Sequence, residues 1–262
     1  MISLIIPVFN NIKSIYLVFQ SIVENLTSDD QLIIIDDFST DGTWETLLGL
    51  QDSEYNFEFI LDRNNKNLGI SSALNLGIKY ATRPYIARHD GDDLVLKDRF
   101  KYQLELLKMN SKIDLLSSSK IIIKDYKNFK KVNSVYQLVK GPPIKIDRNK
   151  LAVNNLITHP GIICKAEVLK SNLYDKYHNS MGEDYHLWLR LMKKKINLYI
   201  DETPVIMYFE NNYPLKIKKQ LFGSIRVRLL SVNLRDPIFC FYLLIGILLD
   251  FMRFVYSFFR YA

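Results

Sequence analysis

Short apolar runs alternate with stretches of helical spacing over the first third of the chain. The apolar runs predict strands at residues 3–7, 32–36, 57–61 and 85–89. Between them, residues 13–25, 43–51 and 71–81 carry apolar side chains at steps of three and four, which predicts helices. Strands that alternate with helices of this length indicate βαβ units and a parallel sheet covered on both faces. The pattern therefore predicts an α/β fold of the nucleotide-binding type.

Three loops follow predicted strands, at the carboxyl edge where open α/β sheets bind their ligands. They read PVFN at residues 7–10, DDFS at 36–39 and DGDD at 90–93. No glycine-rich phosphate fingerprint follows the first strand, and GxxxxGK[ST] occurs nowhere in the chain. These absences argue against a Rossmann dehydrogenase and a P-loop enzyme.

The acidic loops predict a divalent cation. Clustered carboxylates repel one another and any phosphate, whereas Mg²⁺ or Mn²⁺ binds one or two carboxylates together with diphosphate oxygens. An ordinary solvated turn is the alternative for an isolated DxD, since Asp and Gly dominate turns. A calcium loop starting at Asp90 fails, because Val95 and Lys101 stand where it needs Gly and Glu.

Composition and charge narrow the class of protein. The chain has 262 residues and is 48% hydrophobic and 24% charged, within the globular range. Its two cysteines, Cys164 and Cys240, lack metal-ligand neighbours, so we expect neither a disulfide framework nor a zinc cluster, and a reducing cytosolic setting fits. Met1 leads directly into an apolar strand, without the features of a secretory signal. The net charge of +7 comes mostly from residues 207–262, which hold eight Lys and Arg against three acids.

Several segments, in order, resemble the family 2 glycosyltransferases, inverting nucleotide-sugar enzymes of the GT-A fold. The resemblance spans residues 1–208, which we expect to form the glycosyltransferase domain. It is carried by SLIIPVFNN, IIIDDFSTDGTWE, NKNLGISSALNLGI, YIARHDGDDLVLKDRF, THPGIICKAEVL and MGEDYHLWLRL. It implies transfer of one sugar from a nucleoside-diphosphate sugar, expected to be a UDP-sugar, to a glycan hydroxyl, which is an EC 2.4 hexosyltransferase activity that needs Mn²⁺ or Mg²⁺.

The resemblance also implies site residues on the donor side. Phe9 is expected to stack on the base, and one of Asp36 and Asp37 to accept a hydrogen bond from it; the sequence leaves open which. Asp92 is expected to ligate the metal directly, with Asp90 near both the metal and the ribose. The remaining nucleotide-binding residues implied are Pro7, Asn67, Gly69 and Asn75.

On the acceptor side, Asp184 matches the catalytic base, which takes the proton from the acceptor hydroxyl in an in-line displacement with inversion. Glu183 is the second member of this motif. By itself an acidic pair at a helix start also has a structural explanation, because carboxylates are favoured at that end of the dipole. His159 and Arg88 are expected on the acceptor or diphosphate side, and Arg99 could offset the charge of the acidic loop or contact phosphate.

The tail at residues 209–262 is predicted to be helical, basic and amphipathic. Its apolar stretch at 238–249 is shorter than a bilayer needs, and an extension would bring Asp250 and Arg253 into the membrane, so a clean span is disfavoured. The residues Gly246, Asp250, Arg253, Ser257 and Arg260 form one polar stripe, expected to face water. Residues 214–262 are therefore predicted to lie on the cytoplasmic face of the plasma membrane as a peripheral anchor; docking on a partner or in a homo-oligomer, and a tilted span, remain alternatives.

The tail also bears on the acceptor, because a membrane surface suits a lipid-linked glycan in lipopolysaccharide, O-antigen or capsule biosynthesis. The chain lacks the QxxRW motif and the several spanning helices of processive synthases, which predicts single-sugar addition. A sugar-nucleotide pyrophosphorylase is the rival enzyme, but its Gly-rich basic loop is absent. From other classes, a non-catalytic membrane scaffold of the same fold remains open. A nucleic-acid binder is disfavoured, since no reading motif is present.

Overall fold

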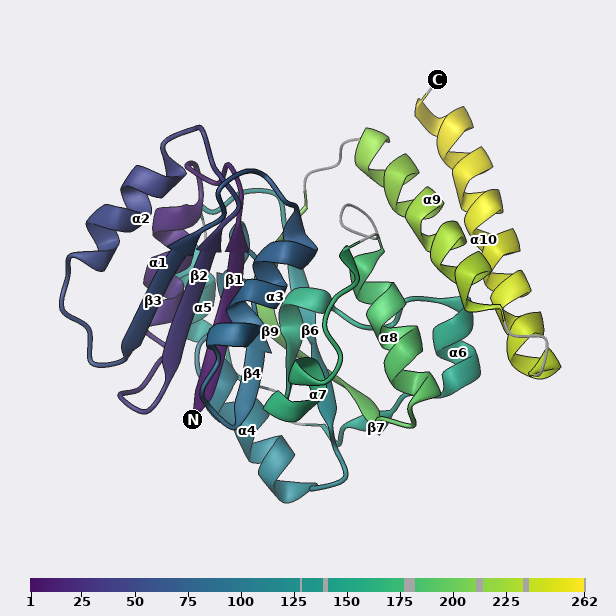
Figure 1. Ribbon diagram of the computed structural model, residues 1–262, viewed down its shortest axis with the longest axis horizontal. Helices are drawn as coiled ribbons and strands as arrows, with labels where there is room; N and C mark the ends of the chain where they lie inside the picture. The colour runs from purple at the N-terminus through teal and green to yellow at the C-terminus, as the bar shows by residue number, and fades with distance from the viewer. Residues whose placement is uncertain (128, 139–140, 177–181, 211–213, 233–235, 262) are drawn as a thin grey trace.

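The computed structural model describes residues 1–127, 129–138, 141–176, 182–210, 214–232 and 236–261 (Figure 1). Strands and helices alternate through the first half, as the pattern predicts. The strands are β1 (Ile2–Val8), β2 (Gln31–Asp36), β3 (Glu58–Arg63), β4 (Tyr85–Arg88), β5 (Leu94–Val95), β6 (Leu115–Ile123), β7 (Ile144–Lys145), β8 (Ile162–Lys165) and β9 (Leu198–Phe209). The helices are α1 (Ile15–Val23), α2 (Thr43–Gln51), α3 (Ile70–Tyr80), α4 (Arg99–Met109), α5 (Phe129–Val135), α6 (Arg148–Val153), α7 (Ala166–Lys170), α8 (Glu183–Lys193), α9 (Pro214–Ser231) and α10 (Pro237–Tyr261), with a 3-10 turn η1 at His159–Gly161.

One mixed sheet runs through the molecule in the order β3-β2-β1-β4-β8-β6-β9-β5, and β7 pairs with β9. The half formed by β3, β2, β1 and β4 is entirely parallel. Beyond β4 the sheet becomes mixed, because β8 lies antiparallel to both β4 and β6, while β6 and β9 are parallel. The predicted α/β fold with a mostly parallel central sheet is confirmed.

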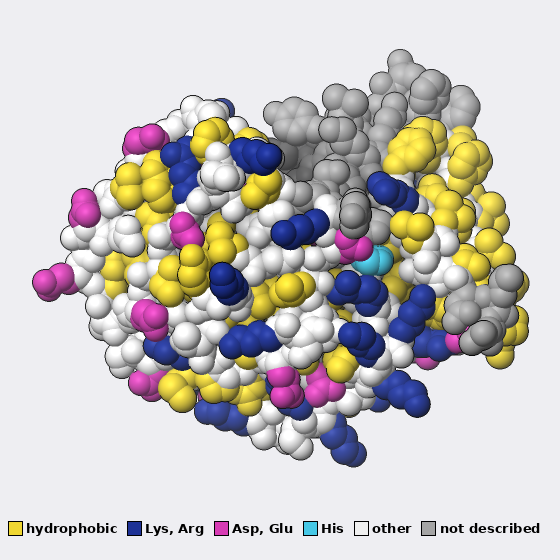
Figure 2. Space-filling model, in the orientation of Figure 1, with side chains coloured by type: hydrophobic (Ala, Val, Ile, Leu, Met, Phe, Trp, Pro, Cys, Tyr) yellow, Lys and Arg dark blue, Asp and Glu magenta, His cyan; other side chains and the backbone are white. Residues whose placement is uncertain are grey.

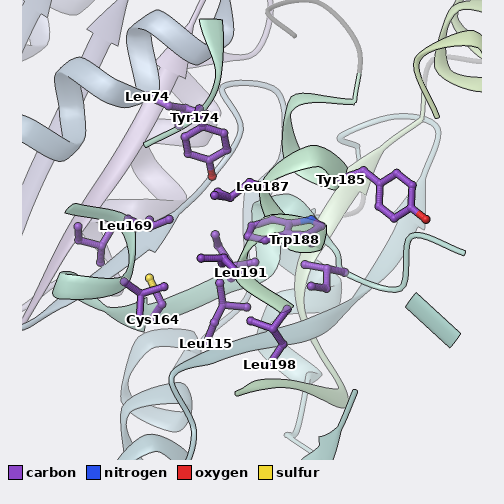
Figure 3. Close-up of a cluster of buried hydrophobic side chains, with 14 of the residues drawn as sticks. Leu74, Leu115, Cys164, Leu169, Tyr174, Tyr185, Leu187, Trp188, Leu191 and Leu198 are labelled. Atoms are coloured by element: carbon purple, nitrogen blue, oxygen red, sulfur yellow. The ribbon is translucent and has the colours of Figure 1, made fainter. Parts of the chain in front are cut away.

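Strand alternation divides the core between the two faces of the sheet. On β1, Ile5 belongs to one buried cluster while Leu4 and Ile6 belong to the other, and β2 alternates in the same way. The first cluster joins the sheet to α3, α7 and α8 (Figure 3). There Trp188 and Leu191 of α8 lie against strand residues, which fixes the helix that begins with the acidic pair Glu183-Asp184.

The tail forms two long helices, α9 and α10, that lie side by side next to α6 and α8 (Figure 1). Along α10, the inner face carries Phe239, Leu243, Gly246 and Asp250, all of them buried. The expectation that the polar stripe faces water is therefore wrong at Gly246 and Asp250. Asp250 turns inward because a buried arginine of α9, Arg228, lies opposite it, and the two side chains are 2.5 Å apart. The side chains of Ser257 and Arg260 lie outside the described part.

The outer face of α10 is apolar. Its exposed side chains are Ile238, Phe241, Leu244, Leu248, Phe251, Met252 and Val255. In the space-filling view these gather with exposed apolar residues of α9 at the side of the molecule (Figure 2). By length and composition alone, Pro237–Val255 could cross a membrane, with a mean hydropathy of 2.2.

Candidate active site

Two neighbouring cavities, of about 450 Å³ and 590 Å³, contain most of the predicted site residues. They share Ile70, Asp90 and Asp92 as a common wall. The smaller one, which we call the nucleotide cavity after the ligand expected from the sequence, is lined also by Pro7, Val8, Phe9, Asn11, Asp37, Asn67, Gly69, Ala73 and Gly91. The larger one, which we call the acceptor cavity because the sequence leads us to expect the acceptor there, is lined also by Arg88, Lys120, Asn155, Leu156, Ile157, Thr158, His159, Pro160, Gly182, Glu183, Asp184 and Tyr208.

The nucleotide cavity is built from the ends of β1 and β2 and the start of α3. Phe9 follows β1 directly and is 45% exposed, so its ring is available to a planar ligand. Asp37 follows β2, and its carboxylate accepts hydrogen bonds from the side chain of Asn64 at 2.6 Å and from the backbone N–H of Gly69 at 2.7 Å. Asp37 therefore fixes the loop that leads into α3, while it also lines the cavity.

Two residues predicted for the nucleotide do not line either cavity. Asp36 is fully buried, forms an ion pair with Arg63 at 3.0 Å and accepts a hydrogen bond from the N–H of Ser39. Asn75, on α3, exchanges hydrogen bonds of 2.9 Å with the backbone C=O and N–H of Tyr174. Both side chains connect neighbouring segments, and of the two adjacent carboxylates only Asp37 reaches the cavity.

Three carboxylates meet in the loop after β4. One oxygen from each of Asp90, Asp92 and Asp93 lies within 4.8 Å of the others, a spacing that a divalent cation can bridge. Asp93 is fully buried, and one of its oxygens accepts from the N–H of Phe209 while the other has no hydrogen-bond partner among the described residues. Burial, and then the charges of Asp90 and Asp92, raise the pKa of Asp93 well above its usual range. These oxygen donors fit a hard cation, which would relieve their mutual repulsion.

Gly91 allows this loop to lie close to β1. A Cβ at this position would come 3.1 Å from Oδ1 of Asn11 and 3.3 Å from Val8. The close approach brings the carboxylates on either side of Gly91 next to the nucleotide cavity, and a larger residue here would crowd Asn11 and Val8.

A buried arginine ties the acidic loop to the acceptor cavity. The guanidinium of Arg99 donates to the carbonyls of Arg88 at 2.9 Å and Pro160 at 2.8 Å and contacts Nδ1 of His89 at 3.0 Å. Arg99 is fully buried and outside both cavities, so it holds the two loops together and does not reach a phosphate.

Arg88 lies between the acidic loop and the acidic pair of α8. It forms an ion pair with Asp90, is almost fully buried and lines the acceptor cavity. Its Nε and Nη1 have no hydrogen-bond partner among the described residues. A buried guanidinium with unused donors is suited to an anionic oxygen of a ligand.

The acidic pair begins α8, directly after Gly182, whose φ of +85° is the left-handed conformation that favours glycine. The side chain of Asn155 donates to Oδ2 of Asp184 at 3.0 Å. Burial raises the pKa of Asp184, and burial together with the Asp184 charge raises the pKa of Glu183 to about 7. Carboxylates with raised pKa values in a cavity are candidates for proton transfer near neutral pH.

His159 lies in η1 at the wall of the acceptor cavity. Its Nε2 contacts the hydroxyl of Tyr174 at 2.8 Å, and its ring packs edge-on against Trp188 with centroids 5.7 Å apart. Burial, with the positive charge of Arg88, holds the pKa of His159 well below its usual range. His159 is therefore a neutral, well-supported wall residue.

Sequence reasoning missed three residues that the structure brings into this region. Asp93 follows the DxD motif directly, and its acidity was a visible signal. Asn155 lies in a loop without any pattern, and Tyr174 contacts His159 across fifteen positions of sequence, so neither gave a local signal.

Proteins of similar sequence identify the family of this chain. The family model "Glycosyl transferase family 2" matches residues 3–172. The chain is 28% identical over 200 residues to an uncharacterized glycosyltransferase of Methanocaldococcus jannaschii, covering 74% of this chain and 65% of that protein. It is 27% identical over 195 residues to the Escherichia coli UDP-Glc:alpha-D-GlcNAc-diphosphoundecaprenol beta-1,3-glucosyltransferase WfgD, covering 74% and 70%. It is also 27% identical to the bifunctional glycosyltransferase pgtA of Dictyostelium discoideum, but it spans only 31% of the length of that protein.

Solved structures share the fold. The mannosyltransferase PcManGT from Pyrobaculum calidifontis, in complex with GDP-Man and Mn²⁺, superposes with a TM-score of 0.73 at 15% identity, over 98% of this chain and 72% of that one. S. aureus TarS in complex with UDP superposes with a TM-score of 0.67 at 16% identity, over 92% of this chain and 70% of that one. The GT-A fold expected from the sequence is thus confirmed, and with the family match across most of residues 1–208 the chain belongs to glycosyl transferase family 2.

Proposed function

We propose that this chain is a metal-dependent, inverting glycosyltransferase that moves one hexose from a nucleoside-diphosphate sugar, a UDP-sugar by preference, to a hydroxyl of a glycan. The observation that carries the proposal is the common wall of the two cavities. Asp90 and Asp92 face the nucleotide cavity on one side and, on the other, the cavity that holds Glu183 and Asp184. A donor whose diphosphate lies at this wall presents its sugar to the acidic pair.

The donor nucleotide occupies the smaller cavity in this proposal. Phe9 stacks on the base, and Asp37 is the carboxylate that faces it, because Asp36 is buried against Arg63. Pro7, Asn67 and Gly69 line the same space. Asn75 supports this wall through the backbone of Tyr174 and has no direct contact with the nucleotide.

Asp92 and Asp90 hold the metal ion, Mn²⁺ or Mg²⁺, and we add Asp93 as a third carboxylate of the cluster. When bound, a divalent cation neutralises the diphosphate and stabilises the nucleoside diphosphate as it leaves. Arg88 directs its unused donors to the same phosphates or to the acceptor.

Asp184 acts as the general base. It takes the proton from the acceptor hydroxyl while that oxygen attacks the anomeric carbon, and the bond to the diphosphate breaks on the opposite side. Glu183 and His159 orient the acceptor at the same wall. General-base catalysis of this kind contributes about 10²–10⁴-fold.

The acceptor in this proposal is a lipid-linked glycan of cell-surface polysaccharide biosynthesis, since WfgD is named for a diphosphoundecaprenol acceptor. The exposed apolar face of α10 supports attachment at the cytoplasmic face of the plasma membrane (Figure 2). The buried pairing of Asp250 with Arg228 favours a surface position over a span, because a span would remove Asp250 from its partner. Residues 1–208 then form the catalytic unit, with residues 209–262 as the attachment segment.

Titration of UDP, GDP and dTDP with and without Mn²⁺ tests the donor site. We expect UDP to bind most tightly, and only when the metal is present. The Asp92→Asn variant should lose this metal-dependent binding. Asp184→Asn should bind UDP normally but lose transfer, while Asp125→Asn, an exposed residue outside both cavities, is the matched control. Metal-independent binding, or full activity of Asp184→Asn, would contradict the proposal.

A further inference from the structure

One contact of the proposed base depends on a short segment that the tail holds in place. Asn155, which donates to Asp184, lies two residues beyond the end of α6. The last carbonyl groups of a helix have no partner within it and need other donors. The position of Asn155 therefore depends on what satisfies the carbonyls at the end of α6.

Those donors come from α8 and from the tail helix α9. The hydroxyl of Tyr185 donates to the carbonyls of Leu151 and Ala152, both at 2.8 Å. The guanidinium of Arg228 donates through Nε to the carbonyl of Ala152 at 2.8 Å and through Nη2 to that of Val153 at 2.6 Å. Arg228 is 1% exposed, and its guanidinium lies 4.9 Å from the ring centre of Tyr185.

The second tail helix holds Arg228 in this position. Asp250 of α10 accepts from Nη1 of Arg228 at 2.5 Å and also pairs with Arg253 at 3.1 Å. Arg253 in turn donates to the side chain of Asn154, the residue before Asn155, at 3.1 Å. Two links thus run from α10 to the segment that carries Asn155.

Glycines let the helices approach closely enough for these links. A Cβ at Gly246 of α10 would come 2.4 Å from Nε of Arg228 and 2.9 Å from the carbonyl of Ala152. At Gly182, directly before the acidic pair, a Cβ would come 3.0 Å from Val227 and 3.3 Å from the carbonyl of Gly223, both on α9. Both partners of the contact between Asn155 and Asp184 therefore rest on α9.

We propose that Arg228 is a positioning residue of the active site: by holding the end of α6 it places Asn155 against Asp184, so the tail helices are part of the catalytic apparatus as well as an attachment segment. This rests on the proposed role of Asp184 as the base. It goes beyond that role because it assigns a function to residues about 45 and 65 positions after Asp184 that line neither cavity.

The test compares Arg228→Met/Asp250→Leu with the wild-type chain. Changing both residues avoids an unpaired buried charge, and apolar replacement of a buried ion pair is often close to neutral for stability. The wild-type chain is first assayed with a panel of nucleotide sugars, with water as acceptor, by measuring the nucleotide released. The nucleotide sugar that it turns over fastest is then used to compare the variants. We expect kcat to fall about 10–100-fold, because a displacement of about 1 Å can cost 10²-fold, while the donor KM is unchanged. Arg226→Met, an exposed residue of the same helix, should leave both constants unchanged.

Asn155→Ala separates positioning from a general loss of structure. If Arg228 acts through Asn155, combining Asn155→Ala with the Arg228→Met/Asp250→Leu change lowers kcat no further than the more damaging of the two changes does by itself. Hydrogen exchange is a second readout: amides of residues 152–158 should exchange faster in Arg228→Met/Asp250→Leu, while those of β1 and β2 keep their protection.

Wild-type kcat and wild-type exchange in Arg228→Met/Asp250→Leu overturn the role of Arg228, as do fully additive effects with Asn155→Ala. A wild-type chain that turns over no sugar of the panel, or an active Asp184→Asn, overturns the proposed function instead; the exchange measurement then still decides whether α9 holds the segment after α6.

Discussion

Truncation of Phe9 should weaken nucleotide binding without weakening the fold. Phe9 follows β1, lines the nucleotide cavity and is 45% exposed, so its ring is only partly used in the folded chain. Stacking of a base on an aromatic side chain contributes about 1–3 kcal/mol. Since 1.4 kcal/mol is a factor of ten, Phe9→Ala should raise the Kd of UDP between about 5- and 150-fold. Its unfolding free energy should change by no more than about 0.5 kcal/mol, as is usual at exposed positions.

Phe38 provides a matched control for this measurement. It follows β2, is 40% exposed and lies outside both cavities, with its ring 4.9 Å from the guanidinium of Arg63. Isothermal titration of UDP with Mn²⁺ into the Phe9→Ala and Phe38→Ala variants, with urea unfolding of both, separates binding from stability. An unchanged Kd for Phe9→Ala, or an equal loss in both variants, would refute the stacking position.

Three further predictions follow from the site and the core. The value of kcat should fall as the pH is lowered, because burial raises the pKa of Asp184, the proposed base, which must be ionised, and burial with the charge of Asp184 raises the pKa of Glu183 to about 7; a pH-rate profile at saturating donor checks this, and a flat profile down to pH 5 contradicts it. Gly91→Ala should weaken Mn²⁺-dependent UDP binding, since the added Cβ crowds Asn11 at 3.1 Å; normal metal-dependent binding would show that the loop has room. Trp188→Ala should cost about 3–5 kcal/mol of unfolding free energy in urea, because the side chain is fully buried, and a loss below 1 kcal/mol would be inconsistent with this packing.

The first half of the fold could be predicted because its signals are local. Helix α2 (Thr43–Gln51) begins and ends where its spacing predicts, and α3 differs by one residue at each end. The mixed half could not be predicted, because β8 lies between β4 and β6 through pairings with strands far away in the sequence. Nothing in the four residues of β8, IICK, indicates such partners.

For the site residues, too, local signals could be predicted from the sequence and long-range contacts could not. The acidic loop was visible because three of four consecutive residues are carboxylates. Asp36 and Asp37 could not be told apart, since their difference depends on Arg63 from the neighbouring strand. The inward direction of Gly246 and Asp250 cannot be predicted from the sequence, because a polar stripe looks the same whether it meets water or a buried arginine, and Arg228 lies 22 positions from Asp250.

The inward-facing Asp250 of α10 has a consequence for how the protein would meet a lipid-linked acceptor. Because Asp250 and Arg253 of this helix contact Arg228 and Asn154, its apolar outer face keeps a fixed orientation relative to the two cavities. In the proposed attachment, a bilayer bound to that face would hold the acceptor cavity at one height and one tilt above the lipid. In the proposed function, acceptors would then be selected by how far their free hydroxyl stands from the membrane, so that we expect glycan length itself to be a criterion of specificity.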